Sequence, residues 1–223
     1  MEILKIENLS YRYKDAAPNE FVLKDINYEF ELGKTYAIKG KSGSGKTTLL
    51  SLLSGLEKAT IGNIYYGKKN LKDMDLDKYR SSNIGIIFQS FNLLPHMTAI
   101  ENVILSMDIS KVNIKDKRKK AIELLESVGL NEEKGDSRVL KLSGGEQQRV
   151  AIARSLSYNP KIILADEPTG NLDQETENDI IDIFKELATK QNKCIIIVTH
   201  SKNVSDQVDV VYELKKNKKN WFN

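Results

Sequence analysis

Strand-type hydrophobic patterns dominate the first ninety residues of the chain. Apolar and polar positions alternate there, or short β-rich runs appear, as is typical of strands. The stretch KTTLLSLLS at residues 46–54 has helical character instead, and Gly55 is placed to end it. The predicted strands are residues 2–13, 21–31, 35–40, 62–67 and 83–89.

Between residues 91 and 157 the pattern becomes helical. In KDKRKKAIELLESVG at 115–129, apolar residues from Ala121 to Val128 recur on one helix face, and Gly129 ends the helix. We therefore expect a helical insertion at about 91–157, between two segments of the chain that form the core of the fold.

Two continuous apolar runs follow, KIILAD at 161–166 and KCIIIVTH at 193–200, and a helical pattern at 174–190 separates them. Strands that are apolar throughout, joined by a helix, indicate a parallel sheet covered on both faces. The sequence thus predicts an α/β core of about residues 1–90 and 158–223.

Composition narrows the class of protein. Of 223 residues, 40% are hydrophobic and 29% are charged, which is typical of a globular protein. A net charge of +3 does not favour a nucleic-acid partner. Cys194, the single cysteine, is expected to be a small buried hydrophobe. We expect neither a membrane span nor a signal peptide, and a solvated basic tail at 215–223.

The string GKSGSGKTT at 40–48 fits G-x-x-x-x-G-K-[ST], the P-loop pattern, and lies between a predicted strand and a predicted helix. Glycines allow backbone N–H groups to converge on phosphate oxygens. Lys46 can reach the β- and γ-phosphates, and the Thr47 hydroxyl can ligate Mg²⁺. The residues expected to hold ATP here are Gly40, Ser42, Gly43, Ser44, Gly45, Lys46, Thr47 and Thr48.

Two carboxylates end the apolar run at 161–166. Asp166 and Glu167 fall at the carboxyl end of a predicted parallel strand, where ligands gather in such sheets. We expect Asp166 to hold Mg²⁺ directly or through water, and Glu167 to orient and deprotonate the attacking water. The alternative is a solvated, charged strand end.

A second helix start stands out at 142–156, LSGGEQQRVAIARSL. Ser143 and Glu146 have the spacing of a capping box, which needs no ligand. That motif leaves Gly144 and Gly145 unexplained, because each glycine costs nearly 1 kcal/mol of helix propensity. They indicate close approach of another backbone or of a phosphate.

LSGGEQQR resembles the signature motif of the ATP-binding cassette (ABC) ATPases, and further motifs follow in that family's order. FQSFNLLP resembles the Q-loop with Gln89 at its glutamine, GNLD at 170–173 the D-loop that includes Asp173, and His200 the switch histidine. The resemblance covers essentially the whole chain. The adenine-stacking aromatic falls at Tyr13, with Tyr11 as the alternative.

The resemblance implies a single ABC nucleotide-binding domain: a P-loop core with a mostly parallel sheet, an antiparallel β subdomain and the helical insertion. It implies two subunits paired head to tail, with each ATP held between one P-loop and the partner's Ser143, Gly144 and Gly145. Asp173 would belong to this shared site. Gln89 would contact Mg²⁺ or the attacking water, and His200 would contact the γ-phosphate.

The implied function is ATP hydrolysis at the cytoplasmic face of the membrane, driving a separate membrane permease. We expect docking near residues 90–105, where Phe91, Leu93, Leu94 and Met97 are apolar, with ordinary subdomain packing as the alternative. His96 is expected at the surface or an interface.

Two motif strings, FQSFNLLPHMTAIENV and ADEPTGNLD, resemble the bacterial branch of lipoprotein-releasing, macrolide- and peptide-exporting and cell-division cassettes. Export or extraction of peptides, lipoproteins or hydrophobic compounds is therefore expected, with mechanical signalling through a membrane partner as the alternative. A GTPase is disfavoured, because NKCI at 192–195 lacks the aspartate of a guanine-reading motif.

Overall fold

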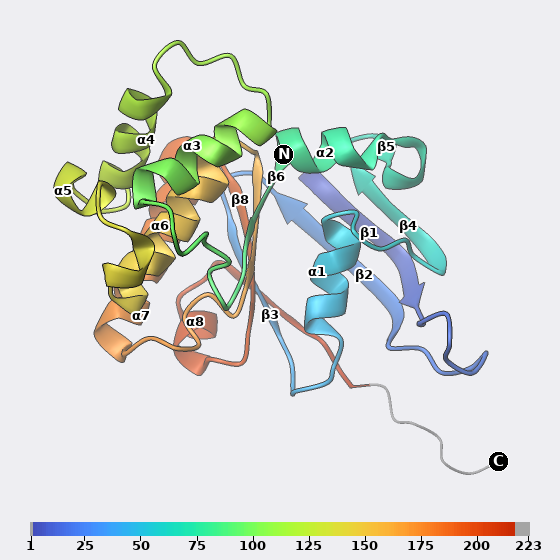
Figure 1. Ribbon diagram of the computed structural model, residues 1–223. Helices are drawn as coiled ribbons and strands as arrows, with labels where there is room; N and C mark the ends of the chain where they lie inside the picture. The colour runs from blue at the N-terminus through green and yellow to red at the C-terminus, as the bar shows by residue number, and fades with distance from the viewer. Residues whose placement is uncertain (1, 217–223) are drawn as a thin grey trace.

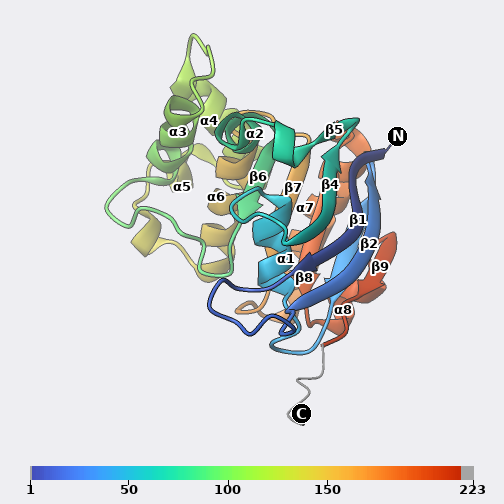
Figure 2. The same ribbon diagram turned by 90° about the vertical axis from the view of Figure 1, so that its right-hand side faces the viewer.

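The computed structural model, in which residues 2–216 are described, contains two sheets and a group of helices (Figures 1 and 2). One sheet is antiparallel, in the order β2-β1-β4-β5, and the other has the order β6-β7-β8-β3-β9. The strands are β1 (Glu2–Tyr11), β2 (Leu23–Glu31), β3 (Thr35–Lys39), β4 (Ile61–Tyr66), β5 (Lys69–Asn70), β6 (Ile84–Ile87), β7 (Ile162–Asp166), β8 (Cys194–Thr199) and β9 (Val210–Glu213). The helices are α1 (Lys46–Leu53), α2 (Leu76–Asn83), α3 (Ala99–Ile109), α4 (Lys117–Glu126), α5 (Glu132–Gly135), α6 (Gly144–Leu156), α7 (Gln174–Gln191) and α8 (Lys202–Asp206), with short 3-10 turns at Leu71–Asp73 and Val139–Lys141.

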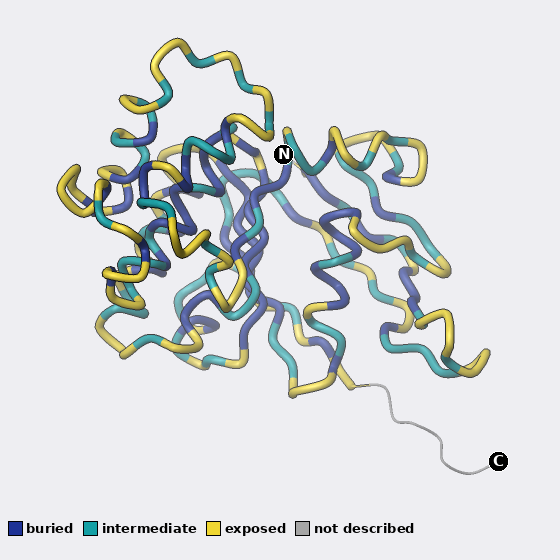
Figure 3. The backbone as a smooth tube through the Cα atoms, viewed as in Figure 1, coloured by how far each residue is buried: buried dark blue, intermediate teal, exposed yellow. Residues whose placement is uncertain are grey.

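All neighbouring strands of the five-stranded sheet pair in parallel, as the continuous apolar runs predict. All six residues of β8 are buried, including Cys194 at 0% exposure. The central strands therefore appear dark blue in Figure 3. The carboxyl ends of β6, β7, β8 and β3 lie at one edge, so the residues that follow each strand meet there.

Helix α1 packs between the two sheets. Its buried leucines, among them Leu49 and Leu52, join one apolar cluster with Leu4 and Phe30 of the antiparallel sheet and Ile196 of β8. Burial on both sides fixes the helix axis, and with it the loop that leads into the helix. The α/β fold with one parallel and one antiparallel sheet is thus confirmed.

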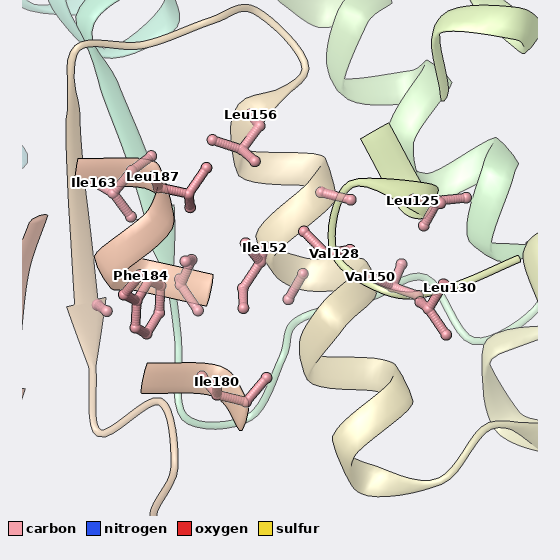
Figure 4. Close-up of a cluster of buried hydrophobic side chains, with 14 of the residues drawn as sticks. Leu125, Val128, Leu130, Val150, Ile152, Leu156, Ile163, Ile180, Phe184 and Leu187 are labelled. Atoms are coloured by element: carbon pink, nitrogen blue, oxygen red, sulfur yellow. The ribbon is translucent and has the colours of Figure 1, made fainter. Parts of the chain in front are cut away.

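Helix α6 is at the centre of the second apolar cluster. Figure 4 shows Ile152 on the side of β7 and α7, near Phe184, while Val150 faces the segment that carries Leu125 and Leu130. This one helix therefore connects the parallel sheet to the outer helices α3 and α4.

The structure departs from the sequence expectations at several elements, including the short strand β5 and the short helix α8, which were not predicted. The helices of the insertion begin at Ala99, because residues 91–98 form turns in which Phe91 and Asn92 have positive φ. Helix α2 and edge strand β9 were not predicted, since α2 is mostly polar and β9 has only four residues. The basic tail lies outside the described residues from 217 onward, and no described helix has the length and apolarity of a membrane span.

Candidate functional site

The P-loop follows β3 and opens α1, as predicted. Gly43 and Gly45 have φ of 75° and 93°, a left-handed conformation that glycine adopts without strain. A Cβ on Gly45 would lie 2.8 Å from Leu23, so the position also has no room for a side chain. Lys46 Nζ donates a 2.9 Å hydrogen bond to the Gly40 carbonyl oxygen, which folds its ammonium group back over the loop.

Asp166 and Glu167 end β7 beside this loop. Asp166 is partly buried, and its Oδ1 atom has no hydrogen-bond partner. Burial raises the pKa of the Asp166 carboxyl, while the neighbouring Thr47 hydroxyl opposes that shift. A buried acceptor without a partner is costly, so it indicates a missing ligand.

Glu167 has φ of +46°, which is a strained conformation for a residue with a long side chain. Its backbone N–H donates to the Val198 carbonyl at 2.9 Å, which holds the residue against β8. The Oε2 atom lies 2.9 Å from His200 Nδ1 and also accepts the His200 backbone N–H at 3.2 Å. The Oε1 atom lies 3.8 Å from Lys46 Nζ. Strain at this position thus aims the carboxylate toward the P-loop.

Gln89 lies beside Glu167 and the P-loop, just beyond the end of β6. It lies two residues beyond the strand and is exposed. A Cβ built on Gly170 would lie 3.3 Å from Gln89 Nε2 and 3.8 Å from Glu167 Cβ. Gly170 therefore leaves room for both side chains, a role that the sequence did not reveal although GNLD was recognised as a motif.

Tyr13 and Tyr11 differ sharply in their surroundings. Tyr13 is 51% exposed, and its hydroxyl is 2.9 Å from Thr48 Oγ1 in the P-loop helix. Tyr11 is 6% exposed and its hydroxyl donates to Glu57 at 3.2 Å. The two rings meet edge to face, with centroids 5.2 Å apart. Only Tyr13 has a free ring face at the phosphate loop, which favours it for stacking on a base.

A cavity of about 720 Å³ joins these groups. The volume suits a nucleotide-sized ligand. Gly40 and Ser44 belong to the same loop without lining the cavity, and Ser44 Oγ is a second buried polar atom that has no hydrogen-bond partner. The lining residues are Tyr13, Val22, Ser42, Gly43, Gly45, Lys46, Thr47, Thr48, Gln89, Asp166, Glu167 and His200.

Besides Gly40 and Ser44, four predicted site residues from outside the P-loop do not line that cavity: Ser143, Gly144, Gly145 and Asp173. Ser143 forms the expected capping box, with Glu146 N–H donating to Ser143 Oγ at 3.2 Å and Ser143 N–H donating to Glu146 Oε2 at 2.8 Å. Asp173 caps α7 by accepting from Thr176 N–H at 2.9 Å. Both residues thus have structural roles in the single chain.

Packing inside the chain explains only one of the two glycines of α6. A Cβ on Gly145 would lie 2.6 Å from Thr176 Cγ2, so a side chain there would clash with α7. A Cβ on Gly144 would be 3.6 Å from Leu172, an ordinary contact, and Gly144 is exposed. Gly144 therefore stays unexplained by the fold of one chain.

The donor set fits a hard divalent cation. The Thr47 hydroxyl, the unpartnered Asp166 Oδ1 and the amide oxygen of Gln89 are oxygen ligands of the kind that Mg²⁺ prefers. Among the described residues no cluster of three or more His, Cys, Asp or Glu side chains could hold a metal alone. A cation here would therefore share its coordination sphere with a phosphate, as in other P-loop sites.

Comparison with known proteins agrees with this geometry. The ABC transporter family matches residues 23–170. The chain is 42% identical to the uncharacterized ABC transporter ATP-binding protein YclH of Bacillus subtilis over 97% of this chain and 95% of that protein. It is 40% identical to the lipoprotein-releasing system ATP-binding protein LolD of Francisella tularensis, over 95% of this chain and 93% of that protein.

The chain is also similar to a solved structure of an ATP-binding cassette. The dimeric, post-hydrolysis ATP-binding cassette MJ0796, bound to ADP and Pi, superposes with a TM-score of 0.86 at 37% identity, covering 97% of each chain. The fold and the site define an ATPase cassette. This chain belongs to the ABC transporter family, as an ATP-binding subunit, and its LolD relatives confirm the predicted branch.

Proposed function

We propose that two copies of this chain pair head to tail around two ATP molecules, hydrolyse them and thereby drive a separate membrane permease at the cytoplasmic face. One observation supports this most strongly. The cavity that contains the P-loop, Glu167 and His200 lacks any residue from the start of α6, while that helix start is exposed and carries an unexplained glycine, Gly144. A second copy that supplies its helix start would complete the cavity.

Binding is assigned to the P-loop and its neighbours. The backbone N–H groups of the loop and the dipole of α1 favour the phosphates. Lys46 exchanges its bond to the Gly40 carbonyl for the β- and γ-phosphate oxygens. Thr47, Asp166 and Gln89 hold Mg²⁺, which when bound neutralises charge that develops on the phosphates. Tyr13 stacks on the base.

We assign the proton transfer of ATP hydrolysis to Glu167. Its carboxylate accepts the proton of the attacking water, and the strained backbone directs it into the cavity. His200 Nδ1 donates to the ionised Glu167 carboxylate, since a carboxylate can only accept. The other ring nitrogen of His200, Nε2, is assigned to the contact with the γ-phosphate.

The partner chain completes the γ-phosphate site. Ser143 and the first N–H groups of α6 point out of the monomer at an exposed helix N-terminus, where an anion is favoured. Gly144 allows the phosphate to approach that backbone. Asp173 lies at the start of α7 next to α6, at the same exposed surface.

The permease is proposed to dock at a groove of about 580 Å³ between α2, β6, α3 and the end of α6. Ile109 lies in its wall and is 68% exposed, which is unusual for so large an apolar side chain. Lys78, Lys111 and Arg154 give the groove a positive charge, since the charges of Arg80 and Asp77 offset each other. An amphipathic permease segment with acidic residues fits this surface.

The loop at residues 90–98, which leads into α3, contributes less apolar surface than its sequence suggests. Phe91 and Leu93 pack against the cluster around α6, whereas Leu94 is 45% exposed. His96 is exposed as well. We propose that Leu94 is the apolar contact of this loop with the permease.

The cargo is proposed to be lipoproteins or other hydrophobic molecules extracted from the membrane. The basis is the likeness to LolD, whose name assigns it to a lipoprotein-releasing system. Nothing in the ATP site contacts cargo, so this assignment depends on the permease.

A complementation experiment tests the shared site. Glu167→Gln and Ser143→Ala proteins are each expected to hydrolyse ATP far more slowly than the parent. When they are mixed before ATP is added, half of the dimers are mixed and each contains one intact site, so about a quarter of the parent rate should return. Recovery of no activity in the mixture, with both proteins folded, would contradict the head-to-tail arrangement.

A further inference from the structure

The segment that follows Gln89 has left-handed backbone at two successive residues, of which Phe91 is strained. Phe91 and Asn92 have φ of 59° and 51°, and neither is glycine. Left-handed backbone is a costly outlier for a bulky residue such as phenylalanine. The turn hydrogen bonds, Phe91 N–H to the Phe88 carbonyl and Asn92 N–H to the Ser90 carbonyl, are local. A contact from outside the loop is therefore needed to hold this conformation.

Arg154, near the end of α6, supplies that contact. Its Nη2 donates to the Phe91 carbonyl oxygen at 2.8 Å, and its Nη1 donates to the Asn92 carbonyl oxygen. One planar guanidinium thus spans the two left-handed residues as a fork, a geometry that an ammonium group does not reproduce. The helix that carries it is fixed in the core by the buried Ile152 and Leu156.

The charge of Arg154 is not balanced by a carboxylate within the described part of the chain. The side chain is half-buried and forms no ion pair with a described Asp or Glu residue. Burial lowers the pKa of its guanidinium, so the position is unfavourable for the charge. Burying a cation without a carboxylate partner costs stability, and here only its hydrogen bonds to carbonyl groups offset that cost.

We infer that Arg154 is a positioning residue that fixes the turn at Phe91 and Asn92 and so holds Gln89 at the metal site. Arg154 also lines the groove assigned to the permease. One side chain therefore touches both the docking surface and the segment that carries Gln89. This inference rests on the proposed role of Gln89 at the cation.

The test compares Arg154→Lys, Gln89→Ala and the double variant in the full chain. Lysine keeps the charge and the aliphatic packing but cannot donate to both carbonyls in one plane. Residues that orient a metal ligand typically affect metal affinity or activity by about 10- to 100-fold. We expect Arg154→Lys to raise the Mg²⁺ concentration for half-maximal hydrolysis, or to lower turnover, by about tenfold. Because Arg154 acts through Gln89, the double variant should lose no more than Gln89→Ala.

Two further measurements separate positioning from loss of fold. Amide hydrogen exchange in nucleotide-free protein should become faster at residues 91 and 92 in Arg154→Lys, while the melting temperature changes little. Arg118→Lys is the matched control, because Arg118 forks onto the Asp136 carboxylate at 3.0 and 2.9 Å on the distant helix α4. It should leave Mg²⁺ dependence unchanged.

The possible results distinguish a wrong role for Arg154 from a wrong role for Gln89. Parent-like Mg²⁺ dependence together with parent-like turnover of Arg154→Lys, or a double variant that loses the product of both single effects, would overturn the positioning role alone. If Gln89→Ala itself leaves Mg²⁺ dependence unchanged, the proposed metal role of Gln89 is wrong, and the role of Arg154 falls with it.

Discussion

The Glu167 carboxylate and the His200 imidazole are hydrogen-bonded, with Oε2 and Nδ1 2.9 Å apart. The two residues end neighbouring parallel strands, and the His200 backbone N–H adds a second bond to the same oxygen. The carboxylate and the imidazole therefore form one hydrogen-bonded unit. A change at either residue is expected to move the other.

Lys46→Ala should abolish tight ATP binding. The substitution removes the ammonium group that reaches the β- and γ-phosphates, and a charge-assisted bond of this kind is among the stronger contacts in a binding site. Lys41→Ala is the control, since Lys41 is an exposed lysine of the same loop. Titration calorimetry with ATP decides between them. Equal affinities for the Lys46→Ala protein and the parent would remove the P-loop assignment.

Tyr13→Ala should weaken ATP binding, because base–aromatic stacking contributes about 1–3 kcal/mol. Tyr13→Phe keeps the ring and loses only the contact to Thr48 Oγ1, so it should bind nearly as well as the parent. The comparison requires only ATP dissociation constants. If Tyr13→Ala binds ATP normally, the base is not stacked on this ring.

Most of the fold follows from local sequence patterns, and the site follows from the order of strands. The apolar runs that became β7 and β8 predict parallel, buried strands, and their polar end residues then meet at one edge. Edge strand β9 and the polar helix α2 have too little hydrophobic periodicity to be found this way.

Backbone strain and contacts between residues far apart in the chain could not be predicted from local sequence patterns. Glu167 and Phe91 adopt left-handed conformations that their residue types disfavour, so residue propensities do not predict them. The signal for Arg154 was present in the sequence as a charge within the apolar run VAIARSL. Its partners, however, lie 62 and 63 residues away, and only the fold brings them together.

Asp166→Asn should stabilise the nucleotide-free protein while it impairs hydrolysis. The pKa of Asp166 is raised by burial, so the ionised carboxylate destabilises the folded state at pH values above that pKa. A neutral amide removes this cost, by on the order of 1 kcal/mol.

The stability gain has a defined pH dependence. As the pH falls through the folded-state pKa, Asp166 takes up a proton in the folded state first, and the difference between variant and parent should shrink. Urea unfolding at several pH values measures it. A difference that grows toward low pH would have the wrong sign for a buried, uncompensated carboxylate.

Gly144→Ala separates the partner's site from the fold of the monomer. The added methyl group has room beside Leu172, and alanine favours helix, so the free energy of unfolding should stay the same or rise slightly. ATP-dependent dimerisation and turnover should fall, because the methyl group faces the partner's phosphate. Melting curves and sedimentation with ATP test both statements. Parent-like turnover would mean that nothing approaches this backbone closely.

Glu167→Gln tests the central claim of a shared, ATP-filled dimer most directly. Glutamine keeps the shape of the side chain but cannot accept the proton, so hydrolysis should slow by about 10²–10⁴-fold. Lys46, Thr47, Asp166 and Ser143 are untouched, so ATP and the partner helix stay bound. Gel filtration with Mg·ATP should then show a stable dimer for this variant, whereas the parent in ADP elutes as a monomer. A Glu167→Gln protein that binds ATP normally and still elutes as a monomer would contradict the account.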